Sequence, residues 1–187
     1  MPDHDRAITI DANVYGYILT YMFNGTTPDN CELIAEFISV LEKGKYIIAI
    51  NDYIIREYED LVGAEINHML IHKWSKESRI IDKQPIPIPL KVSNCMRDEY
   101  KFDIHMRDMT YLETANGTTF KLLITENTRD FCRSHRNGKR RPRLDEYIIK
   151  ELGIKIAGIN QGCHHMSVVL VGEITSELES AATSVGR

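Results

Sequence analysis

Five apolar residues in succession, Tyr46-Ile47-Ile48-Ala49-Ile50, form a run of strand length. An uninterrupted run of this kind is typical of a strand that is buried on both faces in a parallel sheet. Further such runs alternate along the chain with segments of helical spacing: the runs lie at 7–11, 120–125 and 154–159, and the helical segments at 14–23, 28–43, 52–62, 104–116 and 144–152. The alternation predicts an α/β fold with a mostly parallel central sheet and helices on both faces.

Composition excludes several classes of protein. The chain has 23 Lys and Arg against 27 Asp and Glu, a formal net charge of −4, which excludes a uniformly basic nucleic-acid binder. No apolar run approaches the roughly 20 residues that cross a bilayer, and the polar start indicates no secretion signal. We therefore expect a soluble, cytoplasmic protein with no membrane partner. The four cysteines form no Cys-x-x-Cys pair, and no phosphate-binding glycine motif is present, so neither a zinc ribbon nor a nucleotide cofactor is expected.

The length of 187 residues favours a single main domain. We expect this domain to span residues 1–160 and to be followed by an extension at 161–187, with a candidate fifth strand at 166–171. The region 63–98 is expected to be an insertion in the domain. Within it, alternate prolines at 85–89 remove hydrogen-bond donors and fix φ, so that part cannot be helical. We interpret 75–98 as an extended surface segment.

Three acidic residues occupy positions that are unusual for solvated side chains. Asp11 directly follows a strand that should be buried, at the end of a strand where α/β proteins form their functional crevice. Glu57 shares a helical stripe with Ile54, and Asp108 shares one with Leu112. Isolated buried carboxylates are unfavourable and normally become neutral or find a partner. The three acids are therefore candidates for a common site.

Each acid also has an ordinary structural interpretation. Asp11 can cap a helix, Glu57 can pair with a Lys or Arg from elsewhere in the fold, and Asp108 can be a surface residue near a helix start. Brought together, however, the carboxylates would repel one another unless a cation lay between them. All-oxygen sites of this type suit Mg²⁺ or Mn²⁺. Such an ion can activate water and stabilise the charge on a phosphoryl group.

Four segments stand out by their order and spacing: Ile8-Thr9-Ile10-Asp11-Ala12-Asn13, Tyr53-Ile54-Ile55-Arg56-Glu57-Tyr58, Asp108-Met109-Thr110-Tyr111-Leu112-Glu113-Thr114-Ala115 and Leu123-Ile124-Thr125-Glu126-Asn127-Thr128-Arg129-Asp130-Phe131. Together they resemble the PIN-domain ribonucleases. The first resembles that family's strand ending in a catalytic Asp, the second and third resemble its helices that present a Glu and an Asp, and the fourth resembles its strand end followed by Asp-Phe. The match covers residues 7–160.

The resemblance implies a three-layer PIN-like fold and a metal-dependent endoribonuclease that hydrolyses RNA phosphodiester bonds. Such an enzyme acts as a toxin, in defence or in RNA processing, and a toxin would have an antitoxin as its protein partner. Asp11, Glu57 and Asp108 would be catalytic and would hold Mg²⁺ or Mn²⁺.

The resemblance also implies roles for residues around the metal ligands. Asn127 and Asp130 would complete the acidic pocket, with Thr125 or Asn13 as hydrogen-bonding support. The chain departs from the family at Asn127, where an Asp is frequent and where Asn is a poorer ligand for a second metal. The number of ions therefore stays open, and so does an alternative function, a catalytically inactive PIN-like domain that binds RNA or protein.

A basic segment, 133–143, follows the fourth motif and contains no acidic residue. Without it the chain has 17 basic and 27 acidic residues, a net charge of −10. Such runs are frequently just solvated loops. Here we hypothesise that the segment binds the RNA backbone next to the metal pocket. The RNA-binding candidates are Arg133, Arg136, Lys139, Arg140, Arg141 and Arg143.

Two further pairs of residues have helical i,i+4 spacing. His68 and His72 have the spacing of transition-metal ligands, but no third ligand follows, so we expect an ordinary surface pair. Tyr17 and Tyr21 are expected to serve packing or a homodimer surface rather than base stacking.

Overall fold

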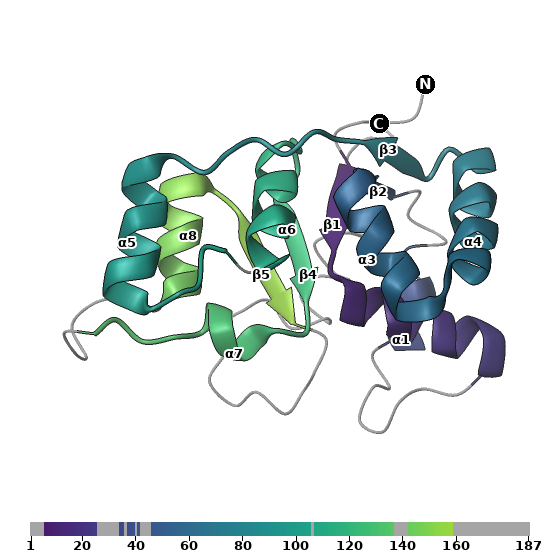
Figure 1. The fold of residues 1–187 in the computed structure, drawn as a ribbon, viewed down its shortest axis with the longest axis horizontal. Helices are drawn as coiled ribbons and strands as arrows, with labels where there is room; N and C mark the ends of the chain where they lie inside the picture. The colour runs from purple at the N-terminus through teal and green to yellow at the C-terminus, as the bar shows by residue number, and fades with distance from the viewer. Residues whose placement is uncertain are drawn as a thin grey trace, which may run out of the picture.

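A computed structural model of the chain describes residues 6–25, 34–35, 37–39, 41, 46–105, 107–136 and 142–158. These residues contain a five-stranded parallel sheet (Figure 1). Its strands are β1 (Ala7–Ile10), β2 (Ile47–Ile50), β3 (Ile80–Asp82), β4 (Leu122–Thr125) and β5 (Lys155–Gly158). They lie side by side in the order β3-β2-β1-β4-β5, and each strand runs parallel to its neighbours.

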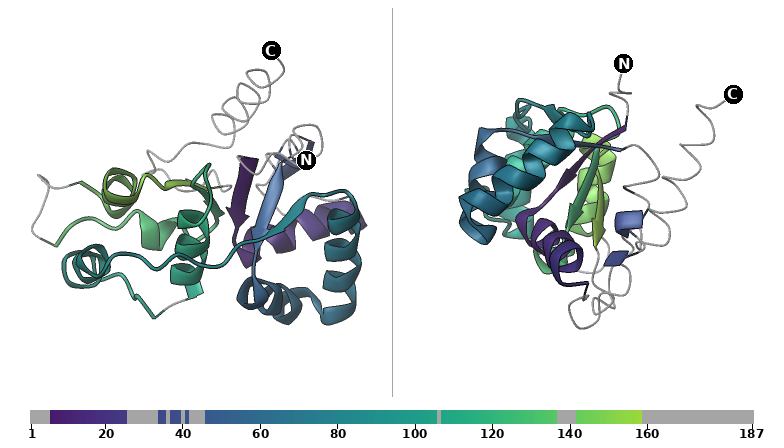
Figure 2. Two further views of the ribbon diagram at one scale, coloured as in Figure 1. Left: turned by 90° about the horizontal axis from the view of Figure 1, so that it is seen from above. Right: turned by 90° about the vertical axis from the view of Figure 1, so that its right-hand side faces the viewer.

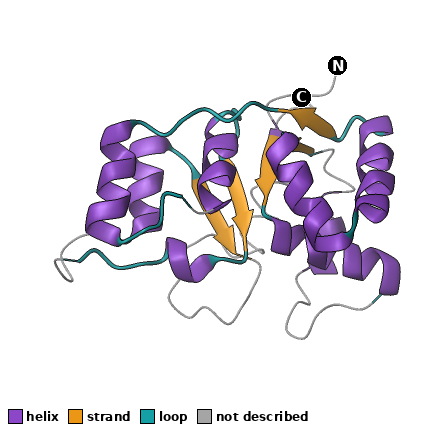
Figure 3. Cartoon of the chain, in the orientation of Figure 1, coloured by secondary structure: helices purple, strands orange, loops and turns teal. Residues whose placement is uncertain are grey.

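Helices flank the sheet in a three-layer α/β arrangement, which confirms the predicted fold class (Figure 2 and Figure 3). They are α1 (Ala12–Asn24), α3 (Asp52–Val62), α4 (Ala64–Lys76), α5 (Leu90–Tyr100), α6 (Arg107–Asn116), α7 (Thr128–Phe131) and α8 (Leu144–Leu152). Residues 34–35, 37–39 and 41 are helical as well. Among the described residues, no helix is both long enough and apolar enough to span a membrane.

The central strands are buried on both faces, as their apolar sequences predict. Ile8 and Ile10 of β1 pack into the main hydrophobic core. Ala7 belongs instead to a second, smaller cluster together with Ile47 and Ala49 of β2. Because a fully buried isoleucine contributes roughly 1.5–3 kcal/mol, packing on both faces is a major source of stability for these short strands.

Asn51 connects α3, the helix that carries Glu57, to α6, the helix that carries Asp108. Its side-chain oxygen caps α3 by accepting hydrogen bonds from two backbone N–H groups of the first turn, both at 3.1 Å. Its Nδ2 donates to Thr114 Oγ1 at 2.8 Å. One buried amide therefore fixes the relative position of two helices that carry predicted site residues.

The region 63–98 differs from the prediction. The interpretation of 75–98 as an extended surface segment is wrong, because this stretch contains the end of α4, the strand β3 and most of α5. β3 pairs with β2, for example Ile80 with Ile48, and forms one edge of the sheet. The apolar part of β3 is only Ile80-Ile81, which is too short to indicate a strand until its pairing with β2 is known. The candidate strand at 166–171 and the extension 161–187 lie outside the described residues.

The proline-containing stretch 83–89 is non-helical, as predicted. It lies along the C-terminal half of α6. Ile86 N donates to Glu113 O at 2.9 Å, Asn116 Nδ2 donates to Ile86 O at 3.3 Å, and Ile88 N donates to Glu113 Oε1 at 3.4 Å. The connection between β3 and α5 is therefore bonded to the helix that carries Asp108.

Candidate active site at the ends of β1 and β4

Asp11 lies where β1 ends and α1 begins, and its carboxylate is held by three donors. Oδ1 accepts from Val14 N at 2.9 Å, which caps α1. Oδ2 accepts from Glu126 N at 2.9 Å and from the hydroxyl of Thr125, both at the end of β4. Burial raises the pKa of Asp11, and these hydrogen bonds lower it. Asp11 is thus both the predicted helix cap and a link between the two central strands.

Asp108 lies in the first turn of α6, a helix that packs against β1 and β4. Asn127 Nδ2 donates to Asp108 Oδ2 at 2.6 Å, and Asn127 N donates to Thr125 Oγ1 at 2.9 Å. Thr125 therefore joins Asp11, through its hydroxyl, to the residue that orients Asp108. The supporting role predicted for Thr125 or Asn13 fits Thr125, because the Asn13 side chain is exposed.

The pKa of Asp108 is raised to about 6: burial raises it most, the hydrogen bond from Asn127 lowers it, and three other carboxylates also raise it. Those carboxylates, in decreasing order of effect, belong to Asp11, Asp130 and Glu57. They come from the β1–α1 junction, from α7 and from α3. Like charges have this effect only over short distances. The fold therefore brings all the predicted acidic residues into one electrostatic neighbourhood.

Glu57 is buried and projects from α3. Arg107 Nε lies 3.0 Å from Glu57 Oε1, an ion-pair distance, yet Oε1 has no hydrogen-bond partner among the described residues. The buried hydroxyl of Tyr111 has no partner among them either. Burial and then Tyr58 and Glu57 raise the pKa of Tyr111, which places this phenol beside the Glu57 carboxylate.

Asp130, on the short helix α7, is engaged by Arg133. Arg133 Nε donates to Asp130 Oδ1 at 3.0 Å, and Nη2 donates to the same oxygen. Arg133 Nη1 also donates to Lys101 O at 2.6 Å. Asp130 is therefore near the other acids but already paired, and Arg133, a predicted RNA-binding residue, serves as its partner.

A pair of stacked tyrosines holds α3 against the end of β1. Tyr58 Oη donates to Ile10 O at 2.6 Å, one residue before Asp11. The ring of Tyr58 stacks on that of Tyr15, with centroids 3.8 Å apart and planes 7° from parallel. This packing fixes the helix turn that presents Glu57.

The donor set suits a hard divalent cation. Carboxylate oxygens from three elements lie around Asp108, and one of them, Glu57 Oε1, is buried without a hydrogen bond. A divalent ion would satisfy that oxygen and relieve the repulsion that raises the pKa of Asp108. Among the described residues, no group of three or more His, Cys, Asp or Glu side chains is already arranged around a single point for a metal. Binding of an ion would thus include side-chain rotation, and Glu57 would have to turn from Arg107.

The predicted RNA-binding residues have different surroundings. Arg136 is exposed, and its backbone N donates to Glu99 O at 2.9 Å. Arg143 pairs with the buried Asp145, with Nε 3.1 Å from Oδ1. Lys139, Arg140 and Arg141 lie outside the described residues.

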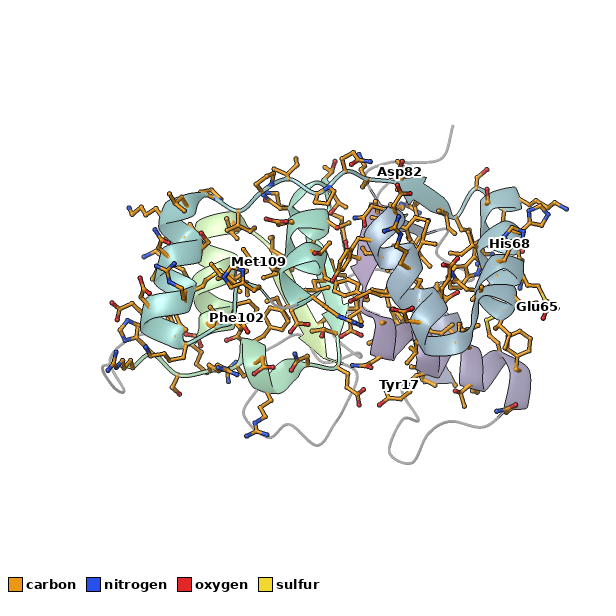
Figure 4. All side chains as sticks on the ribbon, viewed as in Figure 1. Tyr17, Glu65, His68, Asp82, Phe102 and Met109 are labelled. Carbon is orange, nitrogen blue, oxygen red and sulfur yellow. The ribbon has the colours of Figure 1, made fainter. Side chains whose placement is uncertain are left out.

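The two i,i+4 pairs lie on α4 and α1. The rings of His68 and His72 are parallel, with centroids 6.2 Å apart, on the exposed side of α4, where Figure 4 labels His68. Tyr17 and Tyr21 are partly buried and pack against the main core. Packing, one of the two roles expected for these tyrosines, is therefore observed.

Two residues near Glu57 were not predicted from the sequence: Arg107 and Tyr111. They lie four residues apart on α6, so their side chains project from the same face of this helix. An arginine next to an aspartate on a helix carries no distinctive signal. Their relation to Glu57, on another helix, emerges only in the folded structure.

Comparison with known proteins provides no family for the chain. No protein-family model matches it. No curated protein matches it either. Function must therefore be inferred from the residues and their geometry.

Proposed function

We propose that this protein is a metal-dependent endoribonuclease that hydrolyses RNA phosphodiester bonds. The observation that carries the proposal is the raised pKa of Asp108, about 6, to which burial and the charges of Asp11, Asp130 and Glu57 contribute. Assembling like charges from several elements is unfavourable for folding, and strongly perturbed carboxylates of this kind are concentrated at functional sites. The sequence resemblance to the PIN-domain ribonucleases, which rests in part on the same acids, supports this proposal.

Asp11, Glu57 and Asp108 would hold Mg²⁺ or Mn²⁺. When bound, the ion would supply an activated water and would stabilise charge on the phosphoryl group. The chain supplies the positioning: Thr125 and the backbone of Glu126 fix Asp11, and Asn127 holds one oxygen of Asp108. Asp11 and Asp108 are held in this way, whereas Glu57 would have to turn from Arg107 when an ion arrives.

The RNA substrate would approach along the basic segment 133–143. Its exposed Arg136 is the described residue best placed to contact phosphates, since Arg133 and Arg143 are paired with aspartates. Phosphate contacts by arginine are independent of base sequence and weaken as salt increases. A cytoplasmic role in toxin activity, defence or RNA processing, with an antitoxin partner in the first case, belongs to this proposal.

A second candidate is a PIN-like module that binds RNA or protein without cleavage. The observation that favours it is that two of the acids face arginines, Glu57 at Arg107 and Asp130 at Arg133. In such a module these ion pairs would be permanent. In the enzyme, the pair at Glu57 would open for the metal.

Cleavage by purified protein distinguishes the two functions. The wild-type protein should cleave unstructured or structured RNA in the presence of Mg²⁺ or Mn²⁺. This cleavage should stop when EDTA is added. Asp11→Asn should cleave RNA more than about 100-fold more slowly than wild type while keeping the same circular dichroism spectrum. Asp98→Asn is the control, since it alters an exposed aspartate on α5 that is paired with Arg97, and it should leave the rate unchanged.

Cleavage by Asp11→Asn at the wild-type rate would refute the assignment. RNA binding without cleavage, at the same affinity in EDTA, would favour the module.

A further inference from the structure

Arg107 is an exposed arginine that faces the buried carboxylate of Glu57. Its side chain is 70% exposed, while the Glu57 side chain that it faces is 6% exposed. It is also the first residue of α6, directly before Asp108. Arg107 therefore lies at the solvent side of the carboxylate cluster, next to two of the three proposed metal ligands.

The contact between Arg107 and Glu57 is weakly constrained. Arg107 Nε lies 3.0 Å from Glu57 Oε1, but the alignment does not make a hydrogen bond. An ion pair with one solvated partner contributes little free energy, because water competes for the exposed charge. The buried carboxylate nevertheless requires a counter-charge, since an unpaired buried anion is strongly unfavourable. Glu57 thus needs a cation, and the one that it has is easily replaced.

The other arginine in the cluster differs in this respect. Arg133 contacts Asp130 through two of its nitrogens and Lys101 O through the third, so its position is fixed. Its pair with Asp130 is also local, three residues apart in the chain. Arg107 instead reaches across from α6 to α3 with a single contact. The two arginines are therefore expected to behave differently when another cation enters the cluster.

We propose that Arg107 is a further residue of this site, an exchangeable counter-ion that pairs with Glu57 until a divalent cation takes its place. The inference rests on the proposed metal site. Arg107 faces Glu57 Oε1, and a guanidinium and a divalent ion repel each other, so both cannot remain against that one oxygen. Binding of the ion must therefore displace Arg107, and the loss of that pair reduces the apparent affinity for the metal. Arg107 in this way sets the cation concentration at which the site fills.

Calorimetric titration of the full chain with Mn²⁺ tests this inference. Arg107→Gln removes the competing charge and should lower the Kd for Mn²⁺ about threefold to tenfold. Arg107→Lys keeps a cation there and should stay nearer to wild type. Arg97→Gln is the matched control: it removes an arginine from an exposed pair with Asp98 on α5, and it should leave the Kd unchanged. A melting curve for each variant checks that folding is intact, as expected for a side chain as exposed as Arg107.

The outcomes separate this inference from the nuclease assignment. An unchanged or higher Kd in Arg107→Gln overturns the inference, even if the protein cleaves RNA. A lower Kd in a protein that binds Mn²⁺ but never cleaves RNA supports the inference and overturns the nuclease assignment. If neither wild type nor Arg107→Gln binds Mn²⁺, both are overturned.

Discussion

Replacing Asp108 by asparagine should stabilise the protein at neutral pH while removing the proposed nuclease activity. The substitution changes the charge but hardly the shape of the side chain. Asn127 Nδ2 donates to Asp108 Oδ2 at 2.6 Å, and the amide oxygen of the new side chain can accept the same bond. The perturbation therefore isolates the effect of one negative charge within the carboxylate cluster.

The magnitude follows from the pKa of Asp108, which burial, foremost, and the neighbouring carboxylates raise from 3.8 to about 6. Each unit by which the pKa differs between the folded and the unfolded protein corresponds to about 1.36 kcal/mol. The charge of Asp108 therefore destabilises the fold by at most about 3 kcal/mol. The side chain is only partly buried, and screening by solvent reduces the expected destabilisation by the charge to about 1–2 kcal/mol.

The sign of the pH dependence is fixed by the direction of the shift. Since the folded protein binds this proton more tightly than the unfolded chain, its free energy of unfolding decreases as pH rises from about 3.8 to about 6. Above that window the full destabilisation is present. Asp108→Asn should therefore be about 1–2 kcal/mol more stable than wild type at pH 7.5, and its advantage should shrink as pH falls toward 4.5.

Urea unfolding in EDTA at several pH values measures this difference. Asp98→Asn serves as the control, because Asp98 is exposed, is paired with Arg97 and has a lowered pKa, caused mainly by its hydrogen bond from Arg97. It should bring no gain in stability. If Asp108→Asn is less stable than wild type at pH 7.5, or if its advantage does not vary with pH, the cluster does not destabilise the fold and the reasoning fails.

Two further predictions concern the basic segment and the tyrosine that holds α3. Replacing Arg140 and Arg141 by alanine should weaken RNA binding and flatten its salt dependence, measured by fluorescence anisotropy; unchanged binding at every salt concentration would remove their proposed role. Tyr58→Phe deletes the donor that lies 2.6 Å from Ile10 O and should reduce the free energy of unfolding by about 1–2 kcal/mol in urea, whereas an unchanged midpoint would show that this carbonyl finds another donor.

Much of the sheet could be predicted because its strands carry their own signal. Runs such as 46–50 are apolar at every position, and burial on both faces requires that composition. β3 could not be predicted in the same way. Its apolar part is only two residues long, and what makes it a strand is the neighbouring β2, which lies some thirty residues earlier in the chain.

In the candidate site too, some residues could be predicted from the sequence and others could not. Asp11 was identifiable because an acid directly after a buried strand is unusual, and Thr125 because it lies in the fourth segment that resembles the PIN-domain ribonucleases. Arg107 offered no comparable signal. Its significance comes from the distance to Glu57, fifty residues away in sequence, and that distance depends on how α3 and α6 pack.

The bonds along α6 have a consequence for how the site can move. Thr114 is held by Asn51, and Glu113 and Asn116 by the segment 83–89, so the C-terminal half of this helix is anchored. The other half carries Asp108 roughly 9 Å from that anchor, at 1.5 Å per residue, and Asn127 holds the Asp108 carboxylate there. A change in the 83–89 connection would act on the anchored end of the helix and, through the helix, on the position of Asp108, although this connection bonds to none of the carboxylates around Asp108. The proline-containing connection is therefore a place from which the geometry of the acidic cluster can be adjusted at a distance.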